Sequence, residues 1–485
     1  MKKESCGIAG IALDEGNAAL PLFYALYTLQ HRGQESAGIA VSSRKENEGG
    51  KGDISLMKGM GFVYEVFSTH QLESFKGNVG IGHVRYSTTG ASKKENAEPL
   101  LVNYHKGKIA IAHNGNLVNT AELKRELQRE GRVFHSDTDT EVIAHLLVKG
   151  LVRHDPIEAI GNMMKRVIGS YSLVILVDST LIAVRDPFGI KPLCLGEIND
   201  ANGGKGYVIA SESTAIDMLD GTFIRDVRPG EMLMINPTQD LRAENNLESH
   251  QLCRGVNTAH CVFEYIYFAR PDSILDGQLV YDVRMKIGAR LAEEHGVEAD
   301  MVSPVPDSGI AFAIGYAKRS GLDYEEGFIK NRYVGRTFIM PEKGSRDDAV
   351  RLKLNVVRAT VEGKRMVLVD DSIVRGTTSR RIMGFLKNKG AKEVHLRVGS
   401  PPIIAPCYLG IDTPTREELL ASYRSLDEIK DFLNVDSIGY LSLDGLIDSV
   451  GIAANNLCLG CLTGKYPVEI PGEECIARQL KLSHF

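Results

Sequence analysis

The sequence lacks two features that would indicate a membrane or a nucleic acid as partner. No hydrophobic run reaches the ~18 residues that a membrane-spanning helix needs, and residues 1–5 are too short for a secretory signal. Lys and Arg number 57 against 62 Asp and Glu, so the formal net charge of -5 provides no basic field for nucleic acid. We expect a cytoplasmic protein that binds neither nucleic acid nor membrane.

Tryptophan is absent, which decides nothing, and there is no internal repeat or low-complexity tract. Eight cysteines among 485 residues do not make a disulfide scaffold, so in a reducing cytosol they serve catalysis, metal binding or packing. Hydrophobic residues at 43% and charged residues at 25% are typical of globular proteins. The length exceeds one ordinary core, so we predict two domains.

The stretch MVLVDDSIVRGTTS has the pattern of a strand, an acidic loop and a helix start. Met366 to Val369 predict a buried strand, and the residues from Thr378 onward predict a helix. Backbone N–H groups and hydroxyls of the loop can hold a phosphate at the helix N-terminus, while Asp370 and Asp371 reach the hydroxyls of a sugar. A solvated acidic turn capped by Thr378 is the alternative interpretation.

The whole stretch resembles the signature with which type I phosphoribosyltransferases, an α/β fold, bind 5-phosphoribosyl 1-pyrophosphate (PRPP). In that family, acidic residues hold the ribose hydroxyls and the following loop holds the 5-phosphate. The resemblance implies that PRPP contacts Asp370, Asp371, Ser372, Arg375, Gly376, Thr377, Thr378 and Ser379.

Cys6 opens a strand-like run, CGIAGIAL, near the start of the chain. A small buried core cysteine is the alternative interpretation. If residues 1–5 were removed as a propeptide, the thiol and a free α-amino group would belong to the same residue. An amine with an unperturbed pKa of about 7.7 to 8.0 could then serve as general base for the thiol.

Three further stretches carry polar residues suited to an amino-acid substrate. Arg85 ends a strand, and its planar guanidinium can donate two parallel hydrogen bonds to an α-carboxylate. Asn114 and Gly115 are predicted in a turn where they could receive an oxyanion. Asp137 and Asp139 precede a helix and could accept an ammonium group. Taken singly, Arg85 fits a surface ion pair, Asn114 a turn residue and Asp139 a helix cap. Together with Cys6, these residues supply a nucleophile, an oxyanion hole and two clamps, one for each charged group of an amino acid.

This half resembles the class II glutamine amidotransferases, whose fold is an αββα N-terminal-nucleophile (Ntn) hydrolase sandwich of two β-sheets between helices. The resemblance implies Cys6 as nucleophile, Arg85 and Asp139 as glutamine binders, and Asn114 with Gly115 as oxyanion hole. Asp139 is preferred to Asp137 because the family places the acid directly before Thr-Glu-Val.

Residues 236–260 are polar and predict a connector, so the expected domains are 6–260 and 261–485. The string that follows, CVFEYIYFARPDS, is apolar enough to be buried between the halves. It resembles the segment that begins the synthase domain of glutamine PRPP amidotransferases.

A second strand and turn, VSPVPDSG, could carry pyrophosphate and its metal on Asp307 and Ser308, because ligands of open α/β sheets collect at the carboxyl ends of strands. A plain turn is the alternative. The basic stretch 330–358, with Arg332 and Lys353, predicts a lid that neutralises the diphosphate and excludes water; a solvated charged face is its alternative.

Two cofactors follow from the resemblance. Mg²⁺ suits a site of few carboxylates and substrate oxygens, and the family places it near Ser308, Asp370 and Asp371. Four thiolates suit either a 4Fe-4S cluster or a structural zinc, and spacing alone does not choose between them. The resemblance to an iron–sulfur subset favours a cluster that pins the C-terminal segment of the second domain. Its expected ligands are Cys261, Cys407, Cys458 and Cys461, with Cys253 and Cys475 as substitutes.

Nearly the whole chain resembles the glutamine PRPP amidotransferase family, which combines both signatures in this order. The resemblance implies that glutamine, PRPP and water give 5-phosphoribosylamine, glutamate and pyrophosphate, the first step of de novo purine biosynthesis. Ammonia would cross an internal passage between the two sites. The resemblance also implies a homotetramer with purine nucleotides as feedback inhibitors. Two rival functions stay open: amination of another sugar phosphate, as in glucosamine-6-phosphate synthase, and non-catalytic PRPP sensing.

Overall fold

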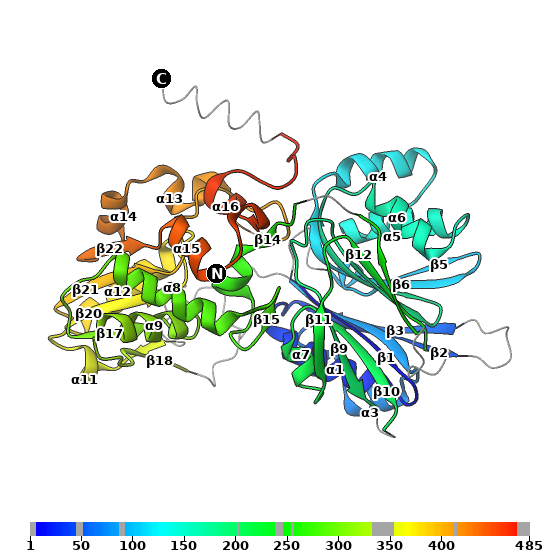
Figure 1. Cartoon of the computed structure of the whole chain (residues 1–485), viewed down its shortest axis with the longest axis horizontal. Helices are drawn as coiled ribbons and strands as arrows, with labels where there is room; N and C mark the ends of the chain where they lie inside the picture. Colours follow the sequence, from blue (N-terminus) through cyan, green and yellow to red (C-terminus); the bar gives the residue numbers. More distant parts are fainter. Residues whose placement is uncertain are drawn as a thin grey trace.

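The computed structural model describes residues 6–44, 52–86, 93–200, 203–237, 246–253, 257–331, 354–411, 413 and 415–472. Figure 1 shows two bodies side by side, one built from the first half of the chain and one from the second. The predicted propeptide, Arg332, Lys353 and Cys475 lie outside the described residues. No helix within the described ranges is both long and apolar enough to cross a membrane.

The first body contains two antiparallel sheets. One has the spatial order β11 (Thr222–Asp226), β9 (Cys194–Asn199), β10 (Lys205–Ala210), β1 (Gly7–Leu13), β4 (Val79–Arg85), β2 (Ser36–Arg44) and β3 (Gly52–Met60). The other has the order β13 (Leu247–Gln251), β12 (Glu231–Ile235), β8 (Thr180–Arg185), β7 (Gly169–Val177), β6 (Gly107–Leu117) and β5 (Leu100–Tyr104).

Helices cover the outer face of each sheet. The first sheet is covered by α1 (Ala19–Thr28), α2 (Val63–Val66), α3 (Thr69–Ser74) and α7 (Thr214–Asp217), with the short turn η1 (Leu29–His31) after α1. The second is covered by α4 (Thr120–Arg129), α5 (Asp139–Leu151) and α6 (Pro156–Met164), and a short turn, η2 (Lys94–Asn96), precedes β5. The predicted αββα sandwich is therefore confirmed.

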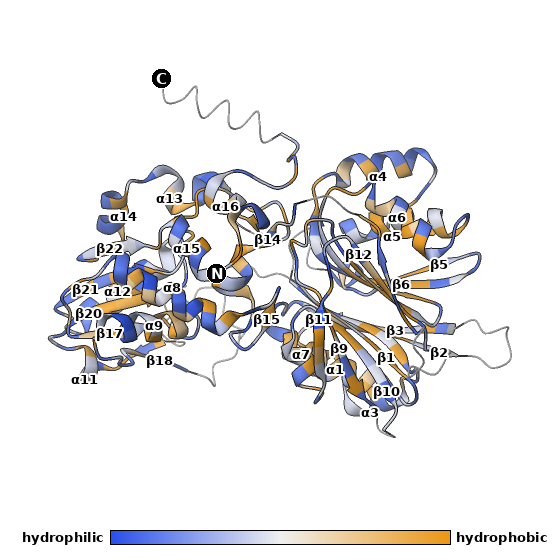
Figure 2. Cartoon of the chain, in the orientation of Figure 1, coloured by the Kyte–Doolittle hydropathy of each residue, from blue (hydrophilic) through white to orange (hydrophobic). Residues whose placement is uncertain are grey.

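Strand β1 shows why this layering forms. Its side chains alternate, so Ala9 and Ile11 pack under the helices while Ile8 and Ala12 pack between the two sheets. Figure 2 shows the strands of the sandwich as largely hydrophobic. Both faces are buried, which explains why β1 contains almost no polar residue.

The prediction of a connector over residues 236–260 was partly wrong. Leu247–Gln251 form β13, which pairs with β12 at the edge of the second sheet. The segment is polar because an edge strand leaves side chains such as Glu248 and Ser249 exposed to water. The chain leaves the sandwich only after this strand.

The second body is built on four parallel strands in the order β17 (Met301–Pro304), β20 (Arg365–Asp370), β21 (Glu393–Val398) and β22 (Ser437–Tyr440). One face is covered by α8 (Val280–Glu294), α9 (Ile310–Ser320) and α15 (Leu443–Val450), and the other by α12 (Thr377–Asn388) and α14 (Leu426–Leu433). This is the predicted α/β arrangement, and burial on both faces explains the continuous apolar run of β20.

Short elements complete this body. They are β14 (His260–Cys261) paired with β23 (Leu457–Cys458), β15 (Ile274–Leu275) with β16 (Gln278–Leu279), β18 (Phe328–Lys330) with β19 (Leu354–Val356), and the helices and turns η3 (Glu264–Phe268), α11 (Arg358–Val361), η4 (Arg416–Glu418), α13 (Leu420–Tyr423), η5 (Ala454–Asn456) and α16 (Gly460–Thr463).

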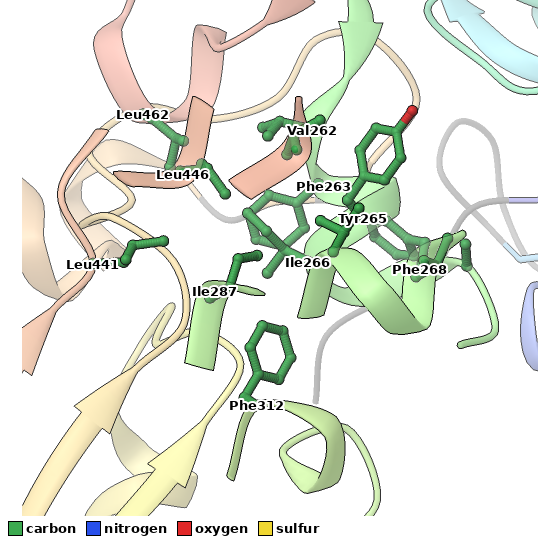
Figure 3. Close-up of a cluster of buried hydrophobic side chains, with 14 of the residues drawn as sticks. Val262, Phe263, Tyr265, Ile266, Phe268, Ile287, Phe312, Leu441, Leu446 and Leu462 are labelled. Atoms are coloured by element: carbon green, nitrogen blue, oxygen red, sulfur yellow. The ribbon is translucent and has the colours of Figure 1, made fainter. Parts of the chain in front are cut away.

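The π-helical turn η3 lies at the boundary between the bodies and is buried, as predicted for CVFEYIYFARPDS. Figure 3 shows Phe263 and Ile266 lying between Phe312 of α9 and Leu446 of α15. One apolar cluster therefore joins η3 to α8, α9 and the C-terminal segment, so the start of the second body cannot move without the residues around it.

Candidate functional site

The antiparallel register of β1 and β4 brings the predicted nucleophile beside Arg85. Gly7 pairs with Val84, and continuing that register sets Cys6 opposite Arg85. The Cys6 thiol donates to the carbonyl oxygen of Tyr86 over 3.6 Å. Two residues separated by 79 positions in sequence thus meet at the end of one sheet.

The electrostatic surroundings of Cys6 keep its thiol protonated. Burial is the main cause that raises its pKa to about 12, and the nearby Glu98 carboxylate adds to the effect, while Arg85 and Lys191 oppose it. A thiol with this pKa is not a nucleophile at neutral pH on its own. The site therefore requires a general base close to Cys6.

Arg85 is buried and already holds a carboxylate. Its Nη1 donates to Glu35 Oε1 over 2.7 Å, and the pairing of β2 with β4 places Ser36 opposite Arg85. A substrate α-carboxylate that binds this guanidinium must share it with Glu35 or displace it. Glu35 was not singled out from the sequence, although it lies in the stretch LQHRGQE.

The prediction that Asn114 and Gly115 lie in a turn was wrong, because both residues are inside strand β6. Asn114 pairs with Ser172 and Gly115 with Tyr171 of β7. A Cβ at Gly115 would lie 2.1 Å from the carbonyl oxygen of Ser170, so the glycine permits a close approach of two strands rather than a reversal. Asn114 is fully buried.

Asp139 is the first residue of α5 and is buried, whereas Asp137 is exposed. Asp139 Oδ2 accepts a hydrogen bond from the backbone N–H of Leu117 over 2.9 Å, and its Oδ1 lies 3.6 Å from Nδ1 of His113. Burial alone would raise the pKa of Asp139, but the charge of His113 and these hydrogen bonds lower it. A buried, ionised carboxylate of this kind can receive an ammonium group.

Glu98 connects the oxyanion strand to the helix that carries Asp139, and no motif in the sequence pointed to it. Its Oε2 accepts from the backbone N–H of His113 over 2.8 Å, and its Oε1 accepts from the Thr140 hydroxyl over 2.6 Å. His113 precedes Asn114 in β6, and Thr140 follows Asp139 in α5. One buried carboxylate thus fixes the strand and the helix that carry the predicted substrate contacts.

In the second body, the two predicted PRPP loops leave the same edge of the sheet. Strands β17 and β20 are parallel, with Pro304 opposite Val369, so the turn at Asp307 and the loop after Asp370 are neighbours. Asp371 donates its backbone N–H to Asp370 Oδ1 over 2.9 Å, and the Ser372 hydroxyl donates to Asp371. Asp370, Asp371 and Ser372 are buried, whereas Asp307 is exposed and pairs with Lys330.

The loop ends at the N-terminus of α12, as the sequence predicted. Gly376 has a φ of +70°, and a Cβ there would lie 2.7 Å from the side chain of Leu420, so only glycine fits the turn into the helix. Thr377 and Thr378 are exposed in the first turn and Ser379 is buried. The first amides of a helix have no intrahelical acceptor and can bind a phosphate. Arg375 is exposed and donates to Glu418 over 2.9 Å.

Arg284 of α8 is a further buried charge that faces this loop. Burial is the main cause that lowers its pKa to about 10, and the carboxylate of Asp371 opposes that effect. Its guanidinium donates to the carbonyl oxygens of Tyr265 and Ala269, each over 2.8 Å. Arg284 is thus hydrogen-bonded to the segment around η3 and lies within electrostatic reach of Asp371 in the predicted ribose-binding loop.

The four predicted cluster ligands come from three separate segments that meet near η3. Cys261 and Cys458 are paired in register between β14 and β23. Burial is the main cause that raises the pKa of Cys461, and Cys407, Cys261 and Cys458 each raise it further, so the four thiols lie within electrostatic reach of one another. In the described part of the chain, no three His, Cys, Asp or Glu side chains already form a metal ligand set.

A loop of the second body touches the strand that carries the predicted oxyanion hole. The side-chain amide of Asn116 donates to the carbonyl oxygen of Tyr408 over 2.8 Å, and the Ser170 hydroxyl donates to that of Leu409 over 2.9 Å. Gly410 follows, and a Cβ there would lie 3.1 Å from the carbonyl carbon of Gly115. The two bodies are thus in direct contact beside one of the candidate sites.

Comparisons with known proteins agree with both halves. A model of the glutamine amidotransferase domain matches residues 83–218, and a model of the phosphoribosyl transferase domain matches residues 271–398. The amidophosphoribosyltransferase of Archaeoglobus fulgidus is 54% identical over 97% of this chain and 99% of that protein. The Bacillus subtilis enzyme of the same name is 46% identical over 96% of this chain and 95% of that protein.

A solved structure is similar over the same length. The glutamine PRPP amidotransferase of Bacillus subtilis complexed with ADP and GMP has a TM-score of 0.87 and 45% sequence identity, and the match covers 96% of this chain and 98% of that one. The resemblance inferred from the two signatures therefore extends to the arrangement of 96% of the chain.

Proposed function

Because this chain belongs to the amidophosphoribosyltransferase family, we propose how its residues perform the reaction of that family. The enzyme converts glutamine, PRPP and water to 5-phosphoribosylamine, glutamate and pyrophosphate, the first step of de novo purine biosynthesis. The observation that carries the assignment of residues is the pair of sites described above, one in each body, on a chain that matches one of these enzymes over 97% of its length.

In the first site, the thiol of Cys6 attacks the amide carbon of glutamine. The raised pKa of this thiol calls for a base, and the α-amino group of Cys6 supplies one once residues 1–5 are removed. The side chain of Asn114 and the backbone N–H of Gly115 receive the tetrahedral oxyanion. Ammonia leaves with the proton taken from the thiol, and water hydrolyses the thioester to glutamate. Arg85 and Asp139 hold the α-carboxylate and α-ammonium groups.

In the second site, ammonia attacks the anomeric carbon of PRPP and pyrophosphate leaves. Asp370 and Asp371 accept hydrogen bonds from the ribose hydroxyls. The 5-phosphate lies on the N-terminus of α12, where the backbone amides, Arg375 and the hydroxyls of Ser372 and residues 377–379 contact it. Asp307 lies beside the diphosphate, whose negative charge Arg332 and Lys353 would neutralise.

A magnesium ion fits the same edge of the sheet, because two carboxylates and a hydroxyl are the hard oxygen donors that Mg²⁺ prefers. Ser308, Asp370 and Asp371 would hold it together with oxygens of PRPP. The ion supplies positive charge that stabilises the leaving diphosphate. The exposed position of Asp307, against the burial of Asp370 and Asp371, favours the latter two as its protein ligands.

A 4Fe-4S cluster fits the donor set of Cys261, Cys407, Cys458 and Cys461, since four thiolates on converging segments are its usual ligands. It would pin the C-terminal segment to η3. A structural zinc is the alternative for the same donors. Analysis of protein purified without oxygen should find iron and sulfide; zinc without iron or sulfide would reject the cluster.

The contact of Tyr408 to Gly410 with β6 supports an internal passage for ammonia, because it joins the two bodies at the oxyanion strand. The solved relative contains ADP and GMP, and this supports purine nucleotides as feedback inhibitors here. The homotetramer and the cytoplasmic location stay predictions from the sequence.

The assay that tests the function is PRPP-dependent release of pyrophosphate, first with glutamine and then with ammonium. The wild-type protein should use both nitrogen donors, and Cys6→Ala should use ammonium alone. An enzyme that aminates another sugar phosphate would release no pyrophosphate from PRPP. A protein that only senses PRPP would be inactive with both donors.

A further inference from the structure

A buried guanidinium connects the nucleophile to both bodies. Arg32 follows η1 and is 1% exposed. Its Nε donates to the backbone carbonyl oxygen of Cys6 over 3.0 Å, its Nη1 donates to Glu212, and its Nη2 donates to Glu264 Oε1 over 2.7 Å. The three donors of one planar group are thus directed at three acceptors from distant parts of the chain.

The two carboxylates tie Arg32 to the second body. Glu264 belongs to η3 and is 2% exposed. Glu212 belongs to the sandwich, but its Oε2 accepts from the Ser273 hydroxyl over 2.6 Å and from the backbone N–H of Arg270 over 3.0 Å, and both of these residues follow η3. The orientation of the Arg32 guanidinium therefore depends on where η3 and the residues after it lie.

The contact with the Cys6 carbonyl is important because Cys6 precedes the first residue of β1 and is outside its ladder. In a mature chain that begins at Cys6, this residue has a single peptide bond, and the carbonyl belongs to the peptide plane that fixes the position of its Cα, from which the thiol and the α-amino group both project. Arg32 Nε is the hydrogen-bond donor that sets that carbonyl. A shift of the guanidinium would therefore move the nucleophile and the proposed base together.

We propose that Glu264, although it belongs to the phosphoribosyltransferase body, is a positioning residue for the cleavage of glutamine: it holds Arg32, and Arg32 holds the backbone of the nucleophile. The inference rests on the proposed role of Cys6. It makes the first reaction depend on the placement of the element that begins the second body, so glutamine is cleaved efficiently only when η3 is in place.

Glu264→Gln is a conservative test of this connection. Glutamine keeps an oxygen at the position of Oε1, which can still accept from Arg32, but it removes the charge. The other oxygen, Oε2, is buried without a hydrogen-bond partner in the described part of the chain, so the amide NH₂ of glutamine would meet no acceptor there and would favour a rotation of the side chain. Arg32→Lys is the second variant, because a single ammonium group cannot reach all three acceptors.

The chain offers a matched control in another ion pair between the bodies. Asp276, in the turn between β15 and β16, accepts from Nη1 and Nη2 of Arg185 over 2.8 and 3.0 Å. Arg185 is 1% exposed, and neither residue contacts Cys6. Asp276→Asn therefore removes a half-buried charge between the same two bodies without disturbing the connection to the nucleophile.

The experiment measures PRPP-dependent pyrophosphate release by the full-length protein with glutamine and with ammonium, on one preparation of each variant, together with its melting temperature. Glu264→Gln and Arg32→Lys should lower kcat with glutamine about 10- to 100-fold, the order of effect of a displaced reacting group, with little change in KM for glutamine. Their activity with ammonium should stay within about twofold of wild type. Asp276→Asn should keep the wild-type ratio of the two activities, even if its melting temperature falls.

The inference is overturned if Glu264→Gln keeps the wild-type ratio of glutamine to ammonium activity, or if Asp276→Asn lowers the ratio by as much. Equal losses with both nitrogen donors would show a general structural effect and would overturn it as well. The proposed role of Cys6 fails separately, in the case that Cys6→Ala retains activity with glutamine.

Discussion

Gly410→Ala should disturb the first reaction from a position in the second body. Gly410 has a φ of +94°, and a Cβ added to it would lie 2.9 Å from Cε of Lys191 and 3.1 Å from the carbonyl carbon of Gly115. Lys191 is fully buried and its Nζ donates to the carbonyl oxygen of Gly410 over 3.3 Å, so its side chain has little room to move away. The added methyl group therefore presses on the backbone that provides the oxyanion hole.

The magnitude has two parts. A left-handed backbone costs a residue with a Cβ roughly 1–2 kcal/mol, and overpacking by one methyl group in a well-packed region costs about 1–3 kcal/mol. Gly321 isolates the first part, because its φ is +77° and a Cβ there would meet nothing within 4 Å. Gly321→Ala should therefore lose only the backbone contribution, and Gly410→Ala should be less stable than Gly321→Ala by about 1–3 kcal/mol.

The assay compares both variants in thermal unfolding and in synthesis with glutamine or ammonium. We expect Gly410→Ala to reduce synthesis with glutamine by about tenfold or more, since small displacements at a reacting centre have large effects. Synthesis with ammonium should be nearly unchanged, and Gly321→Ala should affect neither activity. If Gly410→Ala unfolds no earlier than Gly321→Ala and keeps its activity with glutamine, the added methyl group does not press on the oxyanion strand.

Three further outcomes are expected. Burial and, next, Asp276 raise the pKa of Asp226 to about 6. The protonated carboxyl therefore stabilises the fold fully below its unfolded pKa of about 3.9, and this contribution, at most ~3 kcal/mol, is lost as the pH rises through 6. Between pH 4 and 7, the melting temperature of Asp226→Asn should fall less steeply than that of the wild-type protein. Arg85→Lys should raise KM for glutamine about tenfold or more, because an ammonium group cannot replace the paired hydrogen bonds of the planar guanidinium. An unchanged KM would show that Arg85 does not bind the α-carboxylate of glutamine. Cys461→Ser should reduce bound iron and make the C-terminal segment sensitive to protease, whereas wild-type iron content would exclude this ligand.

The features that sequence predicted best are those set by local pattern. The apolar run before Asp370 and the strand that ends at Arg85 have the expected limits within one residue, because period and burial are visible in the residue types themselves. The exposed edge strand β13 was missed because its polar composition is that of a loop. Asn114 and Gly115 were placed in a turn because Asn-Gly favours one, but nine residue pairs between β6 and β7 continue the strand through them.

The buried charges could not have been predicted in the same way. Arg32, Glu98 and Glu264 are ordinary surface residue types, and each is buried only because partners distant in sequence converge on it. Glu264 lies within the stretch CVFEYIYFARPDS that was expected to be buried, yet its partner Arg32 is 232 positions away in the sequence. Only the folded arrangement shows that they meet.

Ammonia released at Cys6 should reach PRPP without mixing with the solvent. Glutamine labelled with ¹⁵N in the side-chain amide, supplied together with an excess of unlabelled ammonium at a pH where free ammonia is scarce, tests it directly by mass spectrometry of the aminated product. We predict that the product made during glutamine turnover keeps nearly all of the label. A product whose label is diluted to the composition of the bulk ammonium would show that the ammonia escapes to solvent before it reaches PRPP.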